Sequence, residues 1–305
     1  MFRLEARAWT VREMMRFAID LLQKQGIDEA RLNVELLLAH ALQSPRIHLY
    51  ADTGRTLTRR EIRDFRRLLE RRLNREPVQY IVGSTSFMGL LLRVDQRVLI
   101  PRPETETLVE QVMIRCNERE GAGTLRILEV GTGSGNIAIA LAKFLRNVSV
   151  TSFDISEEAL EVARLNAAVQ EVQDRIDFRC LDVFDAVDQL LGRGFDVLVS
   201  NPPYVSEEEW KQLPMEIRRY EPASATSDSG DGYAFYRRLT ELAPLVLRDD
   251  GLIALEIGYR QAVGVTALVD AAGFADTTVI RDLGGIERVV LAHRGPSRLP
   301  PPNFN

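Results

Sequence analysis

Cysteine and histidine are scarce in this chain, and long apolar runs are absent. Its 305 residues include two cysteines, Cys116 and Cys180, and three histidines that form no cluster. A disulfide framework or a metal site is therefore not expected, and so few cysteines are typical of a reducing compartment. No run approaches the ~18 apolar residues that a membrane-spanning helix needs. We expect a cytoplasmic protein with no membrane partner and no metal.

Charge of one sign does not dominate the chain either. The formal net charge is −5, but residues 1–80 carry a net +5 and the remaining residues carry −10. This distribution excludes a uniformly basic nucleic-acid binder. The composition, 45% apolar and 27% charged, is that of an ordinary globular protein, and the length allows about two domains.

The first 80 residues have the apolar periodicity of short helices. Thr10 with Glu13 forms a Ser/Thr-x-x-Glu pattern, which is typical of a helix start because each side chain caps a backbone N–H of the other. Thr58 with Glu61 repeats the pattern. Apolar residues then recur at helical spacing. The sequence predicts a small helical bundle domain over residues 1–82.

The sequence pattern changes after residue 82. Residues 83–106 contain Gly89 among apolar and β-branched residues, which predicts a hairpin and an extended linker. Over residues 107–305 strands alternate with helices, which is typical of the α/β class with a seven-stranded, mostly parallel, doubly wound (Rossmann-like) sheet. The predicted strands are 125–130, 148–153, 176–179, 195–200, 252–257, 277–282 and 287–293.

Three glycines follow the first of these strands. The stretch "EVGTGSG" places Gly131, Gly133 and Gly135, separated by Thr132 and Ser134, between a strand and a helix. Glycine lets the backbone approach a ligand closely and the helix start offers N–H groups, although a tight strand–helix turn would also use glycine. The spacing differs from the dinucleotide pattern G-x-G-x-x-G, so NAD is not favoured.

Acidic residues follow the next two strands. Asp154 comes about 20 residues after the glycines, where a carboxylate can accept hydrogen bonds from ribose hydroxyls or can cap the next helix. Asp182 with Val183 fits the amino group and ring of adenine, or a plain loop. Ligands of open α/β sheets bind at the carboxyl ends of the strands. With the glycines, these residues therefore predict a nucleoside site at one rim.

The fourth strand ends in Asn201-Pro202-Pro203-Tyr204. Proline fixes φ and lacks an N–H, so the Pro202 carbonyl is held in place while Asn201 adds a side-chain carbonyl. Two fixed acceptors can hold both hydrogens of a planar –NH2 group, and the Tyr204 ring can cover that group. The nitrogen lone pair would then face an electrophile, so positioning would catalyse the transfer without a dedicated general base. A rigid loop that ends the strand is the alternative.

A nucleoside-bound electrophile that meets a nitrogen suggests S-adenosylmethionine and methyl transfer. The stretches "EVGTGSG", "FDIS", "LDVF" and "SNPPYV" resemble class I S-adenosylmethionine-dependent methyltransferases that modify exocyclic or amide nitrogen. With "IPRPETE", "EIGYRQ" and a helical N-terminal domain, nearly the whole chain is similar to the release factor glutamine methyltransferases of the PrmC/HemK type.

This resemblance implies a substrate and residue roles. The substrate would be the glutamine of the Gly-Gly-Gln motif in peptide chain release factors, and the products N5-methylglutamine and S-adenosylhomocysteine. Cofactor binding would fall to Gly131, Thr132, Gly133, Ser134, Gly135, Asp154, Asp182, Val183 and Asn201. Substrate binding would fall to Asn201, Pro202, Pro203 and Tyr204, with Asn201, Pro202 and Tyr204 catalytic. The linker residues Arg102, Glu104 and Thr105 would close over the cofactor, unless they form only an interdomain strap.

The chain departs from the family pattern in one loop. After a Glu-Pro pair the family usually carries Ala-Leu-x-Gly-Gly-x-Asp-Gly. Here Glu221-Pro222 and Asp231-Gly232 are retained, but the middle reads "ASATSDSG". The geometry of loop 223–232 therefore stays open. Its Asp/Gly cluster has too few ligands for a calcium loop, so we interpret it as a turn.

Other functions share part of this signal. An N-methyltransferase that acts on another protein glutamine, or on adenine or cytosine of nucleic acid, remains an alternative, although the net −10 after residue 80 disfavours a polyanion. A non-catalytic adaptor would not need the intact Asn201 and Asp154. We expect a monomer that docks release factors on residues 1–82 and does not require nucleic acid as a partner.

Overall fold

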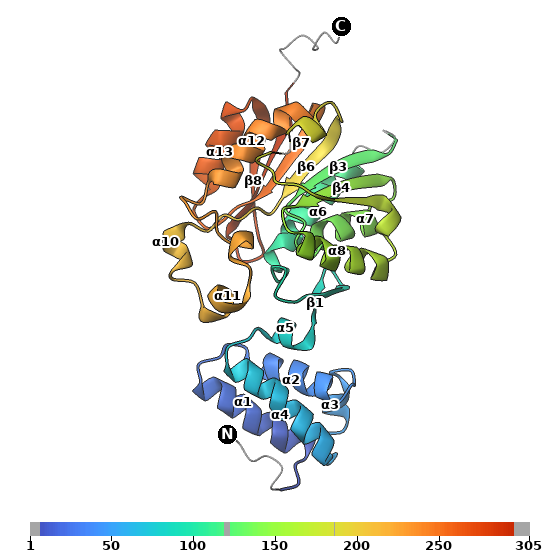
Figure 1. Cartoon of the computed structure of the whole chain (residues 1–305), viewed down its shortest axis with the longest axis vertical. Helices are drawn as coiled ribbons and strands as arrows, with labels where there is room; N and C mark the ends of the chain where they lie inside the picture. The colour runs from blue at the N-terminus through green and yellow to red at the C-terminus, as the bar shows by residue number, and fades with distance from the viewer. Residues whose placement is uncertain (1–6, 119–122, 186, 296–305) are drawn as a thin grey trace. The chain divides into compact units, whose positions relative to one another are not determined.

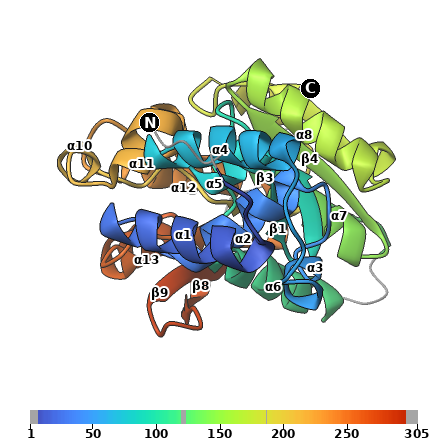
Figure 2. The same ribbon diagram turned by 90° about the horizontal axis from the view of Figure 1, so that it is seen from below.

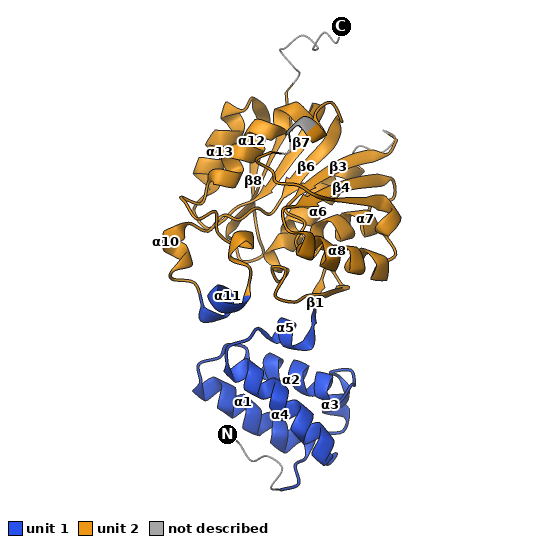
Figure 3. Cartoon of the chain, in the orientation of Figure 1, with its two compact units in different colours: residues 1–84, 214–220 blue, residues 85–213, 221–305 orange. Residues whose placement is uncertain are grey.

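The computed structural model describes residues 7–118, 123–185 and 187–295. The chain forms two compact units (Figure 3). The helical unit comprises residues 1–84 with 214–220, and the sheet unit comprises residues 85–213 with 221–305. This division does not test the domain boundaries that the sequence predicts after residues 82 and 106, which stay predictions. In the part of the chain that the structure describes, no helix has the length and apolar character needed to cross a bilayer.

The helical unit follows the predicted pattern. Both predicted capping boxes are present: Thr10 Oγ1 accepts from Glu13 N at 3.3 Å, while a Glu13 carboxylate oxygen accepts from Thr10 N at 2.8 Å, and Thr58 and Glu61 repeat these contacts. Phe65 and Leu69 line the buried side of one helix, so the apolar stripe packs inward. Its helices are α1 (Val11–Lys24), α2 (Ala30–Ala41), α3 (His48–Ala51), α4 (Arg59–Leu73), α5 (Val78–Val82) and α11 (Met215–Tyr220).

Helix α11 is the element that the sequence did not assign to this unit. Glu216 lies 3.3 Å from Arg75 and 3.4 Å from Arg72, and the Tyr220 hydroxyl donates to the carbonyl of Asn74 at 2.8 Å. These contacts attach a segment of the predicted domain 107–305 to α4. Their partners are more than 100 residues apart in sequence and polar, so periodicity carries no signal for them.

The sheet unit contains the predicted hairpin and the predicted alternation (Figure 1). Met88 and Gly89 both have positive φ, at 49° and 76°, which closes the hairpin in two residues. The strands are β1 (Ser84–Phe87), β2 (Leu90–Arg93), β3 (Leu125–Val130), β4 (Val148–Asp154), β5 (Ile176–Cys180), β6 (Phe195–Ser200), β7 (Leu247–Glu256), β8 (Phe274–Arg281) and β9 (Glu287–Arg294). The helices are α6 (Glu104–Asn117), α7 (Asn136–Phe144), α8 (Glu157–Val169), α9 (Val187–Leu190), α10 (Glu207–Trp210), α12 (Ala234–Val246) and α13 (Ala262–Ala271).

The predicted α/β class and seven-stranded sheet are confirmed. The strand order is β5-β4-β3-β6-β7-β9-β8, and pairing is parallel from β5 to β7 but antiparallel at β9. The chain leaves β3 toward β4 on one side and returns to β6 on the other. A switch point therefore lies between β3 and β6, where ligands of such sheets bind. Strands β7 and β8 begin earlier than predicted. In β7 the apolar run marks mainly the buried part of the strand, whereas in β8 the buried residue, Phe274, lies before the predicted start.

Two apolar cores hold helices on the two faces of the sheet. One core joins α6 and α7 to residues such as Ile127 and Val199, and the other joins α12 and α13 to residues such as Leu128 and Leu198. Alternate residues of β3 and β6 thus face opposite cores, as strand geometry requires. Helices α7 and α8 lie along β4 in both views (Figure 1 and Figure 2).

Candidate active site

The register of the sheet brings four strand ends to one level. Val130 of β3 lies opposite Phe153 of β4 and opposite Ser200 of β6, and Ser200 in turn lies opposite Leu255 of β7. The glycine loop, the Asp154 segment and the Asn-Pro-Pro-Tyr segment therefore leave the sheet side by side. This is the rim that the sequence predicted from the order of its signals.

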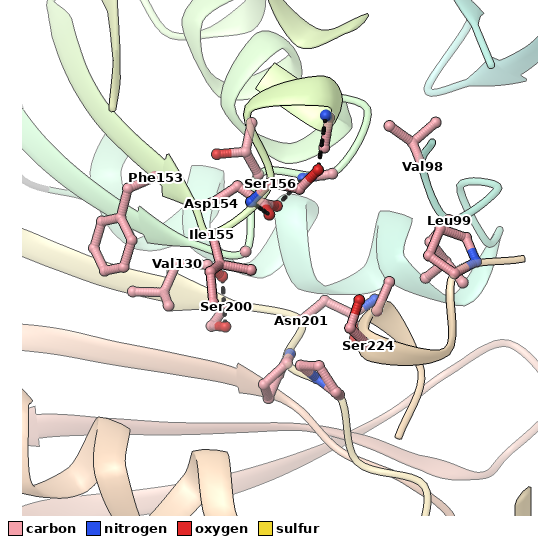
Figure 4. A pocket seen from close by; sticks show the side chains of 18 of the residues that line it. Val98, Leu99, Val130, Phe153, Asp154, Ile155, Ser156, Ser200, Asn201 and Ser224 are labelled. Carbon is pink, nitrogen blue, oxygen red and sulfur yellow. Dashed lines mark hydrogen bonds between the residues drawn. The ribbon is translucent and has the colours of Figure 1, made fainter. Parts of the chain in front are cut away.

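A cavity of about 260 Å³ opens at this rim, slightly below the roughly 300–1,000 Å³ typical of small-molecule sites. In Figure 4, Asp154 and Asn201 lie at the ends of their strands, and Ser224 projects from another loop. The lining residues come from segments 97–105, 130–137, 153–159, 181–184, 200–203 and 222–235. All of these segments belong to the sheet unit.

The glycine loop is held by backbone hydrogen bonds. Gly131 N donates to Phe153 O at 2.9 Å, and Gly133 N donates to Asp154 Oδ2 at 2.9 Å. Gly135 has φ +82°, and a Cβ there would lie 2.9 Å from Ile139 Cδ1 and 3.1 Å from the Ala163 Cβ. Glycine at 135 is thus required for helix packing, whereas the loop itself, with Thr132 and Ser134, lines the cavity.

Asp154 holds the glycine loop to the start of α8. Its Oδ1 accepts from Ser156 N at 3.0 Å, opposite the bond from Gly133 to Oδ2. Burial raises the pKa of Asp154, and these backbone N–H groups lower it. Ser156, whose side chain accepts from Ala159 N, is the helix cap. Since the cap belongs to Ser156, the carboxylate of Asp154 is left to face the cavity.

A buried carboxyl behind the glycine loop was missed by the sequence interpretation. Glu129 is fully buried, and its Oε2 accepts from Ser152 Oγ at 2.5 Å, while Thr132 Oγ1 lies 2.6 Å from Ser152 Oγ. Burial raises the pKa of Glu129 to about 8. This carboxyl is therefore mostly protonated at neutral pH. An acidic residue inside a strand, directly before a glycine loop, was the available signal.

The segment after β5 closes one end of the cavity. Asp182 is half-buried and accepts from Phe184 N at 2.9 Å, while Val183 is buried. Both line the cavity, together with Phe184 and Phe235, whose rings meet edge to face with centroids 5.4 Å apart. Phe235, which the sequence interpretation missed, lies on α12. Val183, Phe184 and Phe235 together form an apolar slot, with Asp182 as a hydrogen-bond acceptor beside it.

Asn201 is anchored through the nitrogen of its side chain. Asn201 Nδ2 donates to Thr105 Oγ1 at 3.1 Å, and Thr105, at the start of α6, is 1% exposed. Asn201, Pro202 and Pro203 all line the cavity. This bond occupies a donor of the Asn201 side chain, and its carbonyl oxygen accepts no hydrogen bond that we identify among the described residues.

Tyr204 lies beside the cavity and is not among the residues that line it. Its ring packs against the second core, and its hydroxyl lies 3.4 Å from Glu256 Oε1. Burial raises the pKa of Tyr204 far above its ordinary value. The Tyr204 carbonyl accepts from Gln261 Nε2 at 3.0 Å. Gln261, the last residue of the stretch "EIGYRQ", therefore helps to hold the Asn-Pro-Pro-Tyr segment in place.

The linker residues meet the loop after Glu221. Arg102 Nη2 donates to Glu221 Oε1 at 2.6 Å, and Ile100 N donates to Glu221 Oε2 at 3.3 Å. Arg102 and Thr105 line the cavity, whereas Glu104 is exposed and is not among its lining residues. Pro222, Ser224 and Ala225, which the sequence interpretation did not name as site residues, complete the wall.

Loop 223–232 is a turn organised by one side chain. Asp228 Oδ1 accepts from Gly230 N at 2.8 Å and from Gly232 N at 3.0 Å, and Asp228 Oδ2 accepts from Ala234 N at 3.0 Å. The carboxylate thus joins the loop to the start of α12. Among the described residues, no group of three His, Cys, Asp or Glu side chains is placed to hold a metal ion.

Comparison with known proteins assigns the chain to a family. Residues 13–83 match the family described as the PrmC N-terminal domain, and residues 106–217 match the methyltransferase small domain. The release factor glutamine methyltransferase of Chlorobaculum tepidum is 42% identical over 93% of this chain and 97% of its own length. Those of Rhodopirellula baltica and Geobacter sulfurreducens are 36% identical over 92% of this chain, and over 95% and 96% of their own lengths. The chain belongs to the family of release factor glutamine methyltransferases.

Proposed function

We propose that this protein methylates the side-chain amide nitrogen of the glutamine in the Gly-Gly-Gln motif of peptide chain release factors, with S-adenosylmethionine as methyl donor. One observation carries the proposal: Asn201 and Pro202 line the same cavity as the glycine loop and Asp154. The residues that we expect to bind the amide and those that we expect to bind the nucleoside thus line one cavity at the switch point. The names of the relatives support the choice of substrate.

The residues present fit S-adenosylmethionine. The Asp154 carboxylate faces the cavity and could accept from ribose hydroxyls, because each of its oxygens has more than one acceptor site. Val183, Phe184 and Phe235 offer an apolar slot for an adenine ring, with Asp182 at its edge. Thr132, Ser134 and the glycines would bind the methionine part of the cofactor. When bound, the cofactor supplies an electrophilic methyl group.

The other side of the cavity would prepare the nucleophile. The carbonyl oxygens of Asn201 and Pro202 would accept the two amide hydrogens of the glutamine, and Pro202 and Pro203 fix the backbone there. Amide nitrogen is a weak nucleophile because its lone pair is delocalised. Holding both hydrogens away from the amide plane directs the lone pair toward the methyl group, and these dipoles are already in place before reaction. As the N–CH3 bond forms, the S–CH3 bond would break and S-adenosylhomocysteine would leave, and the methylated nitrogen would lose one of its two hydrogens to water as a proton. Tyr204, which does not line the cavity, would shape the wall that Asn201, Pro202 and Pro203 form.

The helical unit would dock the release factor, since a single glutamine offers little surface for recognition. We place the reaction in the cytoplasm, where release factors act, and propose that the enzyme works as a monomer without nucleic acid. Arg102 and Thr105 would close over the bound cofactor.

A methyl-transfer assay with labelled cofactor tests this function. It compares a purified release factor, its Gly-Gly-Gln→Gly-Gly-Ala variant and duplex DNA. We expect label on the first substrate alone. Label on DNA would favour the nucleic-acid alternative, and equal label on both release factors would mean that another residue is methylated. No binding of S-adenosylmethionine by calorimetry would favour a non-catalytic adaptor.

A further inference from the structure

An exposed hairpin turn lies at the edge of the sheet that carries the cavity, and the function proposed above gives it no role. Strands β8 and β9 are joined by residues 282–286, and this turn projects from the sheet unit (Figure 2). Leu283 in the turn is fully exposed, and Ile286 is 38% exposed. Because the Leu283 side chain is not buried anywhere in the fold, it is free to contact a partner.

The pairing of the strands places this turn at the carboxyl end of β7. Strand β9 runs antiparallel to β7, with Val289 opposite Glu256, the last residue of β7. Ile257 N donates to Arg288 O at 2.8 Å, so the pairing continues past the end of β7. The turn precedes Arg288 in the chain and therefore lies beyond that end. Since β6 and β7 are parallel, this is also the edge at which Asn201 follows β6.

One side chain holds the turn. Asp282 Oδ1 accepts from Gly284 N at 2.9 Å and from Ile286 N at 3.0 Å, while Asp282 Oδ2 accepts from Arg288 Nε at 3.1 Å. Asp282 N also donates to Ile286 O at 2.8 Å. Leu283 is thus carried by a turn whose backbone is already ordered, so a contact with a partner costs little further ordering.

A chain of hydrogen bonds joins the turn to the Asn-Pro-Pro-Tyr segment. Arg288, which binds the turn, also donates from Nη1 to Ile257 O at 3.4 Å. The next residue, Gly258, donates its N–H to Gln261 Oε1 at 2.9 Å, and Gln261 Nε2 donates to Tyr204 O at 3.0 Å. The turn and the asparagine wall of the cavity therefore belong to one connected framework.

Tyr259 adds an aromatic ring to this edge. It follows Gly258 directly and is 65% exposed, and the guanidinium carbon of Arg260 lies 4.9 Å from the centroid of its ring. We call Tyr259, Leu283 and Ile286 the rim surface. Together they expose on the order of a few hundred Å², well below the ~800 Å² per partner of a stable dimer. This area suits a polypeptide segment whose other contacts lie in the cavity better than it suits a second copy of the chain.

We propose that the rim surface binds an apolar side chain of the release factor segment that carries the methylated glutamine. The inference rests on the proposed function for the identity of this segment. For a glutamine to reach Asn201 and Pro202, the polypeptide on either side of it must cross the edge of the cavity, and the rim surface lies on that edge. Glycines beside the glutamine offer little apolar area, so a neighbouring apolar side chain supplies binding energy that the motif itself lacks.

A matched pair of leucine substitutions tests the proposal in the full chain, with purified release factor and saturating S-adenosylmethionine. Leu283→Ser should raise KM for release factor about tenfold, while kcat at saturation stays within about twofold of native. The control is Leu191→Ser, because Leu191 is an exposed turn residue that precedes β6 and so lies toward the opposite edge of the sheet. Its KM should equal the native value. An unchanged KM in Leu283→Ser, or an equal rise in both variants, would overturn the proposal.

Folding of the variant is checked separately. Since the Leu283 side chain is fully exposed, Leu283→Ser should change the midpoint of thermal unfolding by less than about 2 °C. A photo-reactive benzoylphenylalanine in place of Leu283 should crosslink to the release factor peptide that contains the glutamine. A crosslink confined to a second copy of this chain, or to a remote part of release factor, would contradict the proposal.

Binding without methyl transfer distinguishes failure of this inference from failure of the proposed function. Calorimetry with release factor and S-adenosylhomocysteine should give a Kd about tenfold higher for Leu283→Ser than for the native chain or Leu191→Ser. This result without methyl transfer by the native chain would sink the proposed function and leave the rim surface as a binding site. Methyl transfer with equal Kd in all three proteins would overturn the inference alone. No binding by the native chain would overturn both.

Discussion

The two sides of the cavity are built in different ways. On the glycine side, residues 129–135 with 152–156, the ends of two paired strands hold each other, because Gly131 N donates to Phe153 O and Gly133 N donates to the Asp154 carboxylate. On the asparagine side, residues 201–204, the support comes from side chains of remote segments, with Thr105 binding Asn201 and Gln261 binding the Tyr204 carbonyl. The Asp154 bonds of the first side join residues 21 positions apart or fewer, whereas the supporting bonds of the second side join residues 57 and 96 positions apart.

Truncation of the asparagine side should have the largest effect on catalysis. Asn201→Ala removes the acceptor that the proposed function uses in the transition state, so kcat should fall about 100-fold or more, with little change in cofactor affinity. Steady-state kinetics and calorimetry measure the two quantities. Lost cofactor affinity with intact kcat at saturation would show that Asn201 serves the glycine side instead.

One methyl group added next to the Tyr204 carbonyl should destabilise the asparagine side of the cavity. Gly232 has φ +82°, and a Cβ there would lie 2.6 Å from the Tyr204 carbonyl oxygen. Gly232→Ala should therefore destabilise the protein by about 3 kcal/mol, because a strained backbone and a clash add together.

The matched control for this change is Gly89→Ala, since Gly89 has φ +76° but no atom within 4 Å of the added Cβ. It should cost only about 1 kcal/mol, the price of the backbone conformation alone. Chemical denaturation measures both variants. Equal losses would mean that the contact with Tyr204 is unimportant.

On the glycine side, a change should weaken binding and leave turnover nearly intact. Asp154→Ala removes the carboxylate that faces the cavity, so the Kd for S-adenosylmethionine should rise about tenfold or more, by calorimetry. Values of kcat at saturating cofactor should stay within about threefold of native. A large fall in kcat with unchanged Kd would reverse the roles of the two sides.

The buried carboxyls of Glu129 and Glu256 should also make the free energy of unfolding depend on pH, and Glu129 should contribute more than Glu256. A folded-state pKa raised to about 8 for Glu129, and to about 7 for Glu256, means that the native state keeps protons that the unfolded chain releases. The contribution of these two carboxyls to stability should be full below about pH 4.5 and should be lost as pH rises to about 8, by more than about 1 kcal/mol.

Thermal unfolding of Glu129→Gln and Glu256→Gln across this range measures each share. Both substitutions should flatten the decline, and Glu129→Gln should flatten it more and up to a higher pH. An unchanged slope in Glu129→Gln would show that this carboxyl is ionised in the folded protein.

The same difference explains what sequence could predict. Capping boxes, helical stripes and strand runs depend on neighbours within a few residues, so the helical N-terminal region, the seven strands and the glycine loop were predicted from local pattern. The rim followed from sheet topology, which fixes where strand ends lie. The link from Glu216 to Arg72 and the bond from Asn201 to Thr105 join residues distant in sequence. No spacing rule connects such residues, so the sequence interpretation missed the links.

One structure tests the central claim most directly: a crystal complex with S-adenosylhomocysteine and a peptide that contains Gly-Gly-Gln. We predict that Asn201 Oδ1 and the Pro202 carbonyl each lie about 3 Å from the glutamine amide nitrogen. The Asp154 carboxylate should lie at the ribose hydroxyls. A bound glutamine whose amide nitrogen lies away from both oxygens would contradict the account.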